Sequence, residues 1–119
     1  FPDNILFDET GNVSGVLDFY FAATDFFIYD LMLTFNAWCF DAGGKFQPEN
    51  AKDLMAGYED KRALSGEEKK YLPLMGRAAA VRIVSTRLYD WFFTPPDSIV
   101  TRKDPLPYMR ILEFHREKG

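Results

Sequence analysis

The alternation of apolar and polar residues predicts a short β-rich start to the chain. Residues 4–7 and 14–18 are the two apolar segments, and the polar residues 8–12 separate them. The polar segment ends in Gly11 and Asn12, two residue types that readily adopt positive φ angles in turns. The pattern therefore predicts a β-hairpin within residues 1–18.

A helical pattern replaces this alternation from Asp25 onward. Residues 25–40 are apolar or aromatic on nearly every side, so the helix that they predict must be surrounded by protein. The sequence Asp-Ala-Gly-Gly at residues 41–44 is expected to end it. A second helix is predicted from Pro48 to about Arg62, because proline is favoured at the first helical position.

Capping and breaking residues mark the later helices. Ser65 and Glu68 form a capping box, which predicts the start of a short third helix. A long helix is predicted from Pro73 to Phe92. The sequence Thr-Pro-Pro-Asp that follows is expected to break it, because proline cannot continue the backbone hydrogen bonding.

The last helix is predicted to begin with Asp104 as its N-cap and to run to about His115. His115 has charged neighbours and no second histidine or cysteine at metal-binding spacing, so it is expected to be solvated. These elements predict a single domain over residues 1–119 of the α+β class. It is mainly helical, with an N-terminal hairpin and a helical body over residues 25–116.

Composition and charge narrow the classes of partner. The chain has 119 residues, of which 47% are hydrophobic and 17% aromatic, enough for a packed core. Its net charge is −4 and it has no basic stripe, which argues against a nucleic-acid partner. Asp25, Asp30 and Asn36 interrupt the apolar residues 19–40. An ionised aspartate near a bilayer centre costs roughly 2.5–3.5 kcal/mol, which argues against a membrane span.

Cys39 is the single cysteine of the sequence and cannot form an internal disulfide. It lies between two aromatic residues, so a small buried hydrophobe is the better interpretation than a reactive thiol. An unpaired cysteine fits a reducing, cytoplasmic location.

The open end of the predicted hairpin brings together two side chains that carry oxygen. If Phe7 pairs with residue 14 or 15, the antiparallel register places Asn4 opposite residue 17 or Asp18. Amide and carboxylate oxygens suit Mg²⁺, which leaves further coordination positions to phosphates and water. Asparagine and aspartate are also ordinary turn and cap residues at strand ends, and spacing alone favours that simpler interpretation.

Several segments resemble a known family. Phe1-Pro2-Asp3-Asn4 resembles the end of the catalytic loop in the aminoglycoside phosphotransferase and choline kinase superfamily, and Leu17-Asp18-Phe19 resembles its second metal-binding motif. The segments "GVLDFYFAATDFFIYDLMLTFNAWCFD", "STRLYDWFF" and "KDPLPYMRIL" resemble the homoserine kinases within it. The resemblance implies the C-terminal lobe of a protein-kinase-like fold. It also implies phosphorylation of the homoserine hydroxyl by ATP with Mg²⁺, on the route to threonine.

The resemblance also implies roles for individual residues. Asn4 would hold magnesium, and Asp18 would bridge it to the β- and γ-phosphates of ATP. Asp30 would brace the catalytic loop, since a carboxylate on an apolar helix is costly unless it accepts hydrogen bonds. The family's general base belongs to a His-x-Asp motif expected just upstream of Phe1. No catalytic residue is therefore expected within this chain, and the piece alone, without the base and the nucleotide-binding lobe, is expected to be inactive.

Four residues are candidates for binding the acceptor. Arg82 and Arg87 suit an amino-acid carboxylate. For each of them an ordinary helix-surface role is the preferred interpretation, such as a pair between Arg87 and the aspartate three residues later. Asp25 could bind an amine or act as an N-cap, and Tyr20 could face the acceptor pocket or be packed.

Two alternatives remain for the function. One is a related small-molecule kinase that acts on another amino alcohol or an aminoglycoside, because few residues decide a substrate pocket. The other is a non-catalytic helical binding module. We also expect self-association through apolar surface of the helix at residues 25–40.

Overall fold

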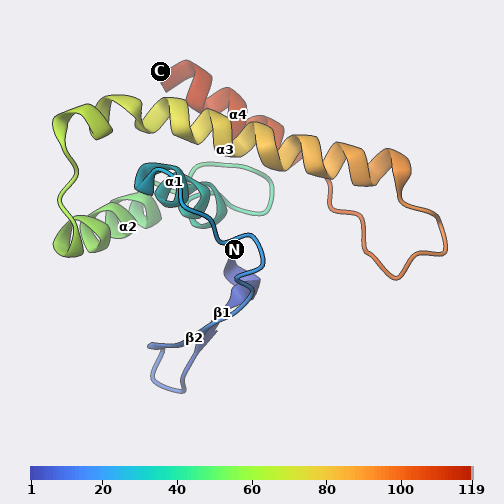
Figure 1. Cartoon of the computed structure of the whole chain (residues 1–119), viewed down its shortest axis with the longest axis horizontal. Helices are drawn as coiled ribbons and strands as arrows, with labels where there is room; N and C mark the ends of the chain where they lie inside the picture. Colours follow the sequence, from blue (N-terminus) through green and yellow to red (C-terminus); the bar gives the residue numbers. More distant parts are fainter. Residues whose placement is uncertain (119) are drawn as a thin grey trace.

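The structure, a computed structural model, describes residues 1–118 as a β-hairpin joined to a helical body (Figure 1). The elements in chain order are η1 (Pro2–Asn4), β1 (Ile5–Phe7), β2 (Val13–Val16), α1 (Phe27–Trp38), α2 (Pro48–Lys61), α3 (Gly66–Phe93) and α4 (Leu106–Lys118). Both α1 and α4 pack against α3, and the hairpin projects away from the helices. The predicted class, α+β and mainly helical, is confirmed.

The hairpin forms where the sequence predicts it, with a shift in register near the turn. Ile5 lies opposite Val16, but an irregularity after Leu6 places Phe7 opposite Val13 instead of residue 14 or 15. The turn is closed by a carboxylate at position 8, which accepts hydrogen bonds from the backbone N–H groups of residues 10 and 12 at 2.9 and 3.0 Å. The turn is thus stabilised by its own side chains, which explains why local sequence predicted it.

The central helix α1 begins later than predicted. Its N-cap is Phe26, so of the two roles considered for Asp25 the N-cap role is excluded. The Asp25 carboxylate instead accepts a hydrogen bond from the backbone N–H of Phe26 at 2.7 Å. This bond fixes the orientation of the Asp25 side chain just before the helix starts.

A tight loop, and not the glycine pair itself, sets the end of α1. The helix stops at Trp38, and the Cys39 carbonyl accepts a hydrogen bond from the N–H of Gln47 at 2.8 Å. Phe40 and Phe46 then form an isolated antiparallel bridge. The predicted helix stop at residues 41–44 therefore forms the tip of a loop.

The third and fourth predicted helices are one continuous helix, α3, which passes through Pro73. The separation into a short helix and a long helix is therefore wrong. Proline inside a helix removes one backbone hydrogen bond and costs about 3 kcal/mol. Leu72 and Met75, on either side of the proline, both pack against the apolar cluster of Ile28 and Leu31. This packing on α1 offsets the cost and keeps the helix continuous.

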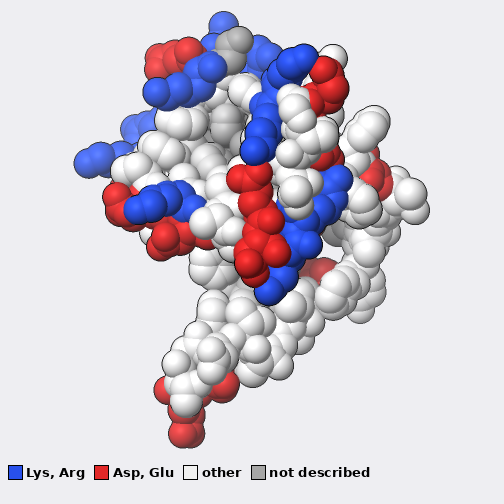
Figure 2. Space-filling view, turned by 90° about the vertical axis from the view of Figure 1, so that its left-hand side faces the viewer, with Lys and Arg blue, Asp and Glu red and all other residues white. Residues whose placement is uncertain are grey.

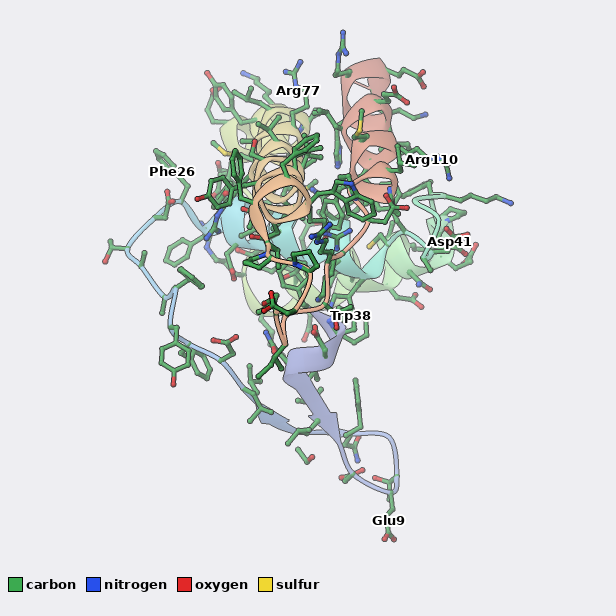
Figure 3. The ribbon with its side chains drawn as sticks, turned by 90° about the vertical axis from the view of Figure 1, so that its right-hand side faces the viewer. Glu9, Phe26, Trp38, Asp41, Arg77 and Arg110 are labelled. Atoms are coloured by element: carbon green, nitrogen blue, oxygen red, sulfur yellow. The ribbon has the colours of Figure 1, made fainter. Side chains whose placement is uncertain are left out.

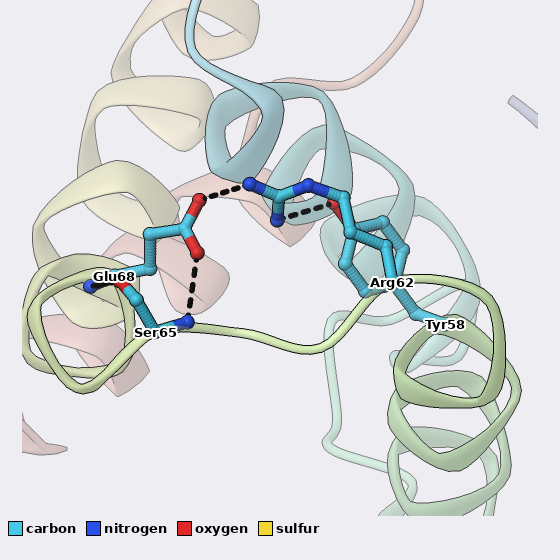
Figure 4. A network of polar contacts seen from close by, with 4 residues as sticks. All are labelled: Tyr58, Arg62, Ser65 and Glu68. Carbon is cyan, nitrogen blue, oxygen red and sulfur yellow. Dashed lines mark hydrogen bonds and ion pairs between the residues drawn. The ribbon is translucent and has the colours of Figure 1, made fainter.

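The predicted capping box at the start of α3 is confirmed, and it takes part in a larger polar network (Figure 4). Ser65 Oγ accepts a hydrogen bond from the Glu68 N–H at 3.1 Å, and Glu68 Oε2 accepts one from the Ser65 N–H at 2.9 Å. Glu68 Oε1 also accepts a bond from Arg62 at 2.6 Å, and this bond is the largest cause that lowers the pKa of Glu68. The Arg62 guanidinium lies 4.8 Å from the ring of Phe27. One arginine thus links α2, α3 and α1.

Two apolar clusters hold the helices together. Their buried members are Cys39, Phe40, Ala51, Ala80, Tyr108 and Ile111 in one, and Ile28, Leu31 and Leu64 in the other. Cys39 is fully buried, and burial raises the pKa of its thiol to about 11. The interpretation of this cysteine as a small buried hydrophobe is confirmed.

His115 is buried, so the expectation that it is solvated is wrong. Only 3% of its surface is exposed, and its Nε2 lies 2.7 Å from Oδ1 of Asn36. Asn36 in turn donates a hydrogen bond from Nδ2 to the backbone carbonyl of Gly76 at 3.0 Å. The three residues join α4, α1 and α3 at one point in the core.

Burial, with a smaller contribution from the charge of Arg77, lowers the pKa of His115 from 6.5 to about 4. Between these values the unfolded chain takes up a proton that the folded chain does not. The contribution of His115 is thus fully present above about pH 6.5 and is lost as the pH falls toward 4. We expect a loss of about 3 kcal/mol in the free energy of unfolding across this range.

Urea denaturation of the complete protein at several pH values tests this expectation. The variant His115→Gln keeps a donor for Asn36 without a titrating ring, so its stability should fall less between pH 6.5 and 4. Equal slopes for wild type and variant would contradict the assignment to His115.

The surface of the helical body carries interspersed charges of both signs, and acidic groups occupy the tip of the hairpin (Figure 2). The large exposed apolar residues concentrate in three segments, Phe1–Leu17, Phe19–Phe27 and Tyr89–Val100. The central helix itself buries Ile28, Leu31 and Met32, so the expected exposed surface lies before α1 and not along it. None of the helices within residues 1–118 combines the length and apolar character that crossing a membrane requires.

Candidate functional site

Asn4 and Asp18 both lie at the open end of the hairpin, on either side of the bond between Leu17 and Asn4. The N–H of Leu17 donates a hydrogen bond to the carbonyl of Asn4 at 2.8 Å, which extends the pairing of Ile5 with Val16. Asn4 is the last residue of η1, and Asp18 follows directly after the paired leucine. The predicted placement of Asn4 opposite residue 17 is confirmed.

Asp18 has a backbone conformation that is rare outside glycine. Its φ angle is +64°, and no other non-glycine residue among residues 1–118 has a positive φ. Aspartate visits this left-handed region more easily than most residues, and such conformations concentrate at ligand-binding sites. The chain therefore changes direction at the residue whose carboxylate is the candidate metal ligand.

The side chains of Asn4 and Asp18 do not behave as ordinary turn or cap residues. A turn residue bonds to nearby backbone, as the Asp8 carboxylate does at the other end of the hairpin. Within the described residues, neither Asn4 nor Asp18 makes such a side-chain bond, and Asp18 is exposed. Their oxygen atoms are therefore free to bind a ligand.

This donor set fits a divalent cation that is shared with phosphates. Mg²⁺ is usually held by one or two protein oxygen ligands together with substrate phosphates and water. Residues 1–118 contain no cluster of three or more histidine, cysteine, aspartate or glutamate side chains that could hold a metal. An amide oxygen from Asn4 and a carboxylate from Asp18 match the shared arrangement and not a cage formed by protein alone.

A cavity of about 780 Å³ opens beside the segment that follows Asp18. Its lining comes from three elements: residues 21–27, then Tyr29, Asp30 and Leu33 of α1, and Arg82 of α3. Figure 3 shows this segment arching away from the helices on its way from the hairpin to Phe26. The volume is within the range of small-molecule sites, about 300–1,000 Å³.

Three predicted site residues meet at this cavity: Asp25, Asp30 and Arg82. All three are exposed. Asp30 lines the cavity from α1, and within residues 1–118 its carboxylate accepts no hydrogen bond of the kind expected for a brace. Its role as a brace for the catalytic loop stays a prediction.

Two other predicted residues lie elsewhere. Arg87 donates a hydrogen bond to the carbonyl of Asp104 at 2.8 Å, and its guanidinium lies 4.5 Å from the ring of Tyr108. These contacts join α3 to the start of α4. The pair with Asp90 that the sequence suggested does not form within residues 1–118. Asp104 Oδ1 also accepts a hydrogen bond from the N–H of Leu106 at 2.9 Å, but α4 begins at Leu106, one residue later than the prediction that makes Asp104 its N-cap. Tyr20 is 93% exposed, so it is not packed, and it does not line the cavity.

The sequence did not single out Phe21, whose ring lies 5.8 Å from the guanidinium of Arg82. This aromatic residue lies in the segment before α1, whereas Arg82 belongs to α3. Helical periodicity relates only residues of the same helix, so it gave no signal for this contact.

The hairpin with its asparagine and aspartate, followed by a helical body, defines the class: the helical C-terminal lobe of a protein-kinase-like phosphotransferase. The family model described as "Phosphotransferase enzyme family" matches residues 1–65, more than half of the chain. The chain belongs to this family.

Curated relatives match nearly the whole chain. It is 52% identical over 116 residues to a homoserine kinase of Gluconacetobacter diazotrophicus, covering 98% of this chain and 36% of that protein. It is 54% identical over 112 residues to a homoserine kinase of Gluconobacter oxydans, covering 94% of this chain and 35% of that protein. A homoserine kinase of Acidiphilium cryptum is 48% identical, with coverage of 100% and 37%. The chain thus spans little more than a third of the length of these relatives.

Proposed function

We propose that the complete protein is a homoserine kinase that uses ATP and Mg²⁺, and that this chain forms its C-terminal lobe. The observation that carries the proposal is the 52% identity over 98% of the chain to a protein of that name. The free oxygen atoms of Asn4 and Asp18 support it, because phosphoryl transfer from ATP needs a metal held against the phosphates.

In this proposal Asn4 and Asp18 hold Mg²⁺, which neutralises charge on the β- and γ-phosphates when bound. The homoserine hydroxyl oxygen forms a bond to the γ-phosphorus, and the bond from that phosphorus to the β–γ bridging oxygen breaks. The hydroxyl proton goes to a carboxylate base, which we place in a His-x-Asp motif preceding Phe1. Positioning and charge neutralisation supply most of the acceleration in such reactions.

The first test is ADP release by the complete protein with Mg-ATP and four acceptors: homoserine, serine, choline and an aminoglycoside. A strong preference for homoserine is expected. If only another acceptor is turned over, the assignment as a phosphotransferase stands but the assigned substrate changes. No turnover of any acceptor, with the His-x-Asp motif present upstream, would instead favour a binding protein.

The location and pathway follow from the same proposal. A phosphorylated homoserine fits an intermediate on the route to threonine, and the buried, unpaired Cys39 fits a cytoplasmic protein. A cell fractionation that places the protein outside the cytoplasm would contradict this location.

We further propose that the 119-residue chain by itself is inactive and self-associates. It lacks the proposed base and nucleotide lobe, and it exposes Phe19, Phe21 and Phe26 by 68%, 84% and 68%. Exposed aromatic patches of this kind drive association in water. Light scattering of the purified chain should show species larger than a monomer, and a monodisperse monomer would contradict the expectation.

A further inference from the structure

We infer that the cavity beside Asp18 is the acceptor site, where Arg82 binds the carboxylate and Asp25 the ammonium group of an α-amino acid. This inference rests on the proposed function and adds to it the residues that select the acceptor. The phosphorylated group is then a hydroxyl on the side chain of that amino acid.

The charges around the cavity are complementary to a free amino acid. Arg82 and Asp25 both line it, and no ion pair joins them or joins Arg82 to Asp30 within the described part of the chain. A cation and an anion that face one hollow without neutralising each other are complementary to a molecule with both charges. A free amino acid carries this pair of charges at neutral pH, whereas choline and aminoglycosides carry no carboxylate.

Neighbouring residues orient both Asp25 and Arg82 toward the cavity. The Asp25 carboxylate is held by the N–H of Phe26 at 2.7 Å through Oδ1, which leaves Oδ2 for a ligand. The Arg82 guanidinium lies 5.8 Å from the ring of Phe21, a distance at which a cation and an aromatic ring attract each other. Both groups are therefore oriented by neighbours that themselves line the cavity.

The cavity begins close to Asp18 along the chain. Its lining begins at Phe21, three residues after Asp18. Three residues span at most about 11 Å when fully extended, so this edge of the cavity lies within that distance of the proposed metal ligand. The edge of the cavity at Phe21 therefore lies nearest to the proposed phosphate site, so the hydroxyl of the bound amino acid is expected to point toward that edge.

Arg82 and Arg87, two of the three arginines on α3, have different surroundings. Arg87 is occupied by the carbonyl of Asp104 and the ring of Tyr108, while Arg82 contacts the cavity. Arg87 therefore offers a matched control on the same helix. Its loss should affect folding without changing the preference among acceptors.

The test uses the complete protein with Mg-ATP and three acceptors: L-homoserine, 3-amino-1-propanol, which lacks the carboxylate, and 4-hydroxybutyrate, which lacks the ammonium group. Arg82→Gln should raise KM for homoserine about 10²-fold and leave kcat/KM for 3-amino-1-propanol nearly unchanged. Asp25→Asn should do the same for homoserine but spare 4-hydroxybutyrate. KM for ATP should not change in either variant.

The ratio of kcat/KM values between acceptors is independent of the fraction of folded enzyme. Arg87→Gln should leave this ratio as in wild type, even if it lowers stability. Active wild type with an unchanged ratio in Arg82→Gln would overturn the inference and leave the proposed function standing. A change of ratio in Asp30→Asn and not in Asp25→Asn would overturn the assignment of Asp25. Wild type without homoserine turnover would overturn both the function and the inference.

Discussion

Replacing Asp18 with asparagine in the complete protein is expected to lower kcat for phosphoryl transfer by about 10³-fold. The carboxylate is the only negative charge in the proposed pair with Asn4, and charge neutralisation around the phosphates supplies much of the acceleration. Asparagine tolerates the left-handed backbone, so the φ angle of +64° is kept and the change tests the charge alone. Initial rates over a range of Mg²⁺ concentrations would measure it.

A matched control is Glu9→Gln, which removes one carboxylate from the tip of the same hairpin (Figure 3). It should leave kcat and the Mg²⁺ dependence within twofold of wild type. If Asp18→Asn retained more than a tenth of the wild-type rate, Asp18 would not be a metal ligand.

Replacing Gly76 with alanine is expected to destabilise the protein by about 3 kcal/mol, although alanine usually favours a helix over glycine. A methyl group at this position would lie 2.6 Å from Cε1 and 2.7 Å from Nδ1 of His115. The imidazole cannot move aside without losing its bond to Asn36 at 2.7 Å. The contact between α3 and α4 would therefore open. The urea midpoint of the complete protein measures the change.

Gly57→Ala provides the opposite result in the same assay. Gly57 lies in α2 and an added methyl group would meet no atom within 4 Å, so alanine should stabilise the protein by up to about 1 kcal/mol. Adding His115→Ala to Gly76→Ala makes room for the methyl group. The double variant should be more stable than the sum of the two single changes predicts. Strict additivity would show that the imidazole is not the obstacle.

Local sequence was enough to predict the elements that are stabilised by their own residues. The hairpin turn depends on a carboxylate that bonds two and four residues ahead, and the start of α3 on the exchange between Ser65 and Glu68. The pairing of Asn4 with Leu17 followed from the short turn, because few registers join two strands over so few residues. The position of Asn4 opposite Leu17 could thus be predicted from sequence, although the partner of Phe7 was not, and the family resemblance gave Asn4 and Asp18 their proposed role as metal ligands.

Only the tertiary structure decided which charged and polar residues are buried and which share a cavity. The continuity of α3 through Pro73 depends on packing against α1. Arg82 and Arg87 occupy the same helix, and only their neighbours on other elements distinguish them.

His115 shows the physical reason most clearly. It bonds to Asn36, which lies 79 residues away in the sequence, and the spacing of Tyr108, Ile111 and His115 on one helical face was the only local sign of its burial. Patterns within a segment report which side of a helix is apolar. The partner that covers that side, and hence the cost or gain of burying a polar group, is set by contacts between distant segments.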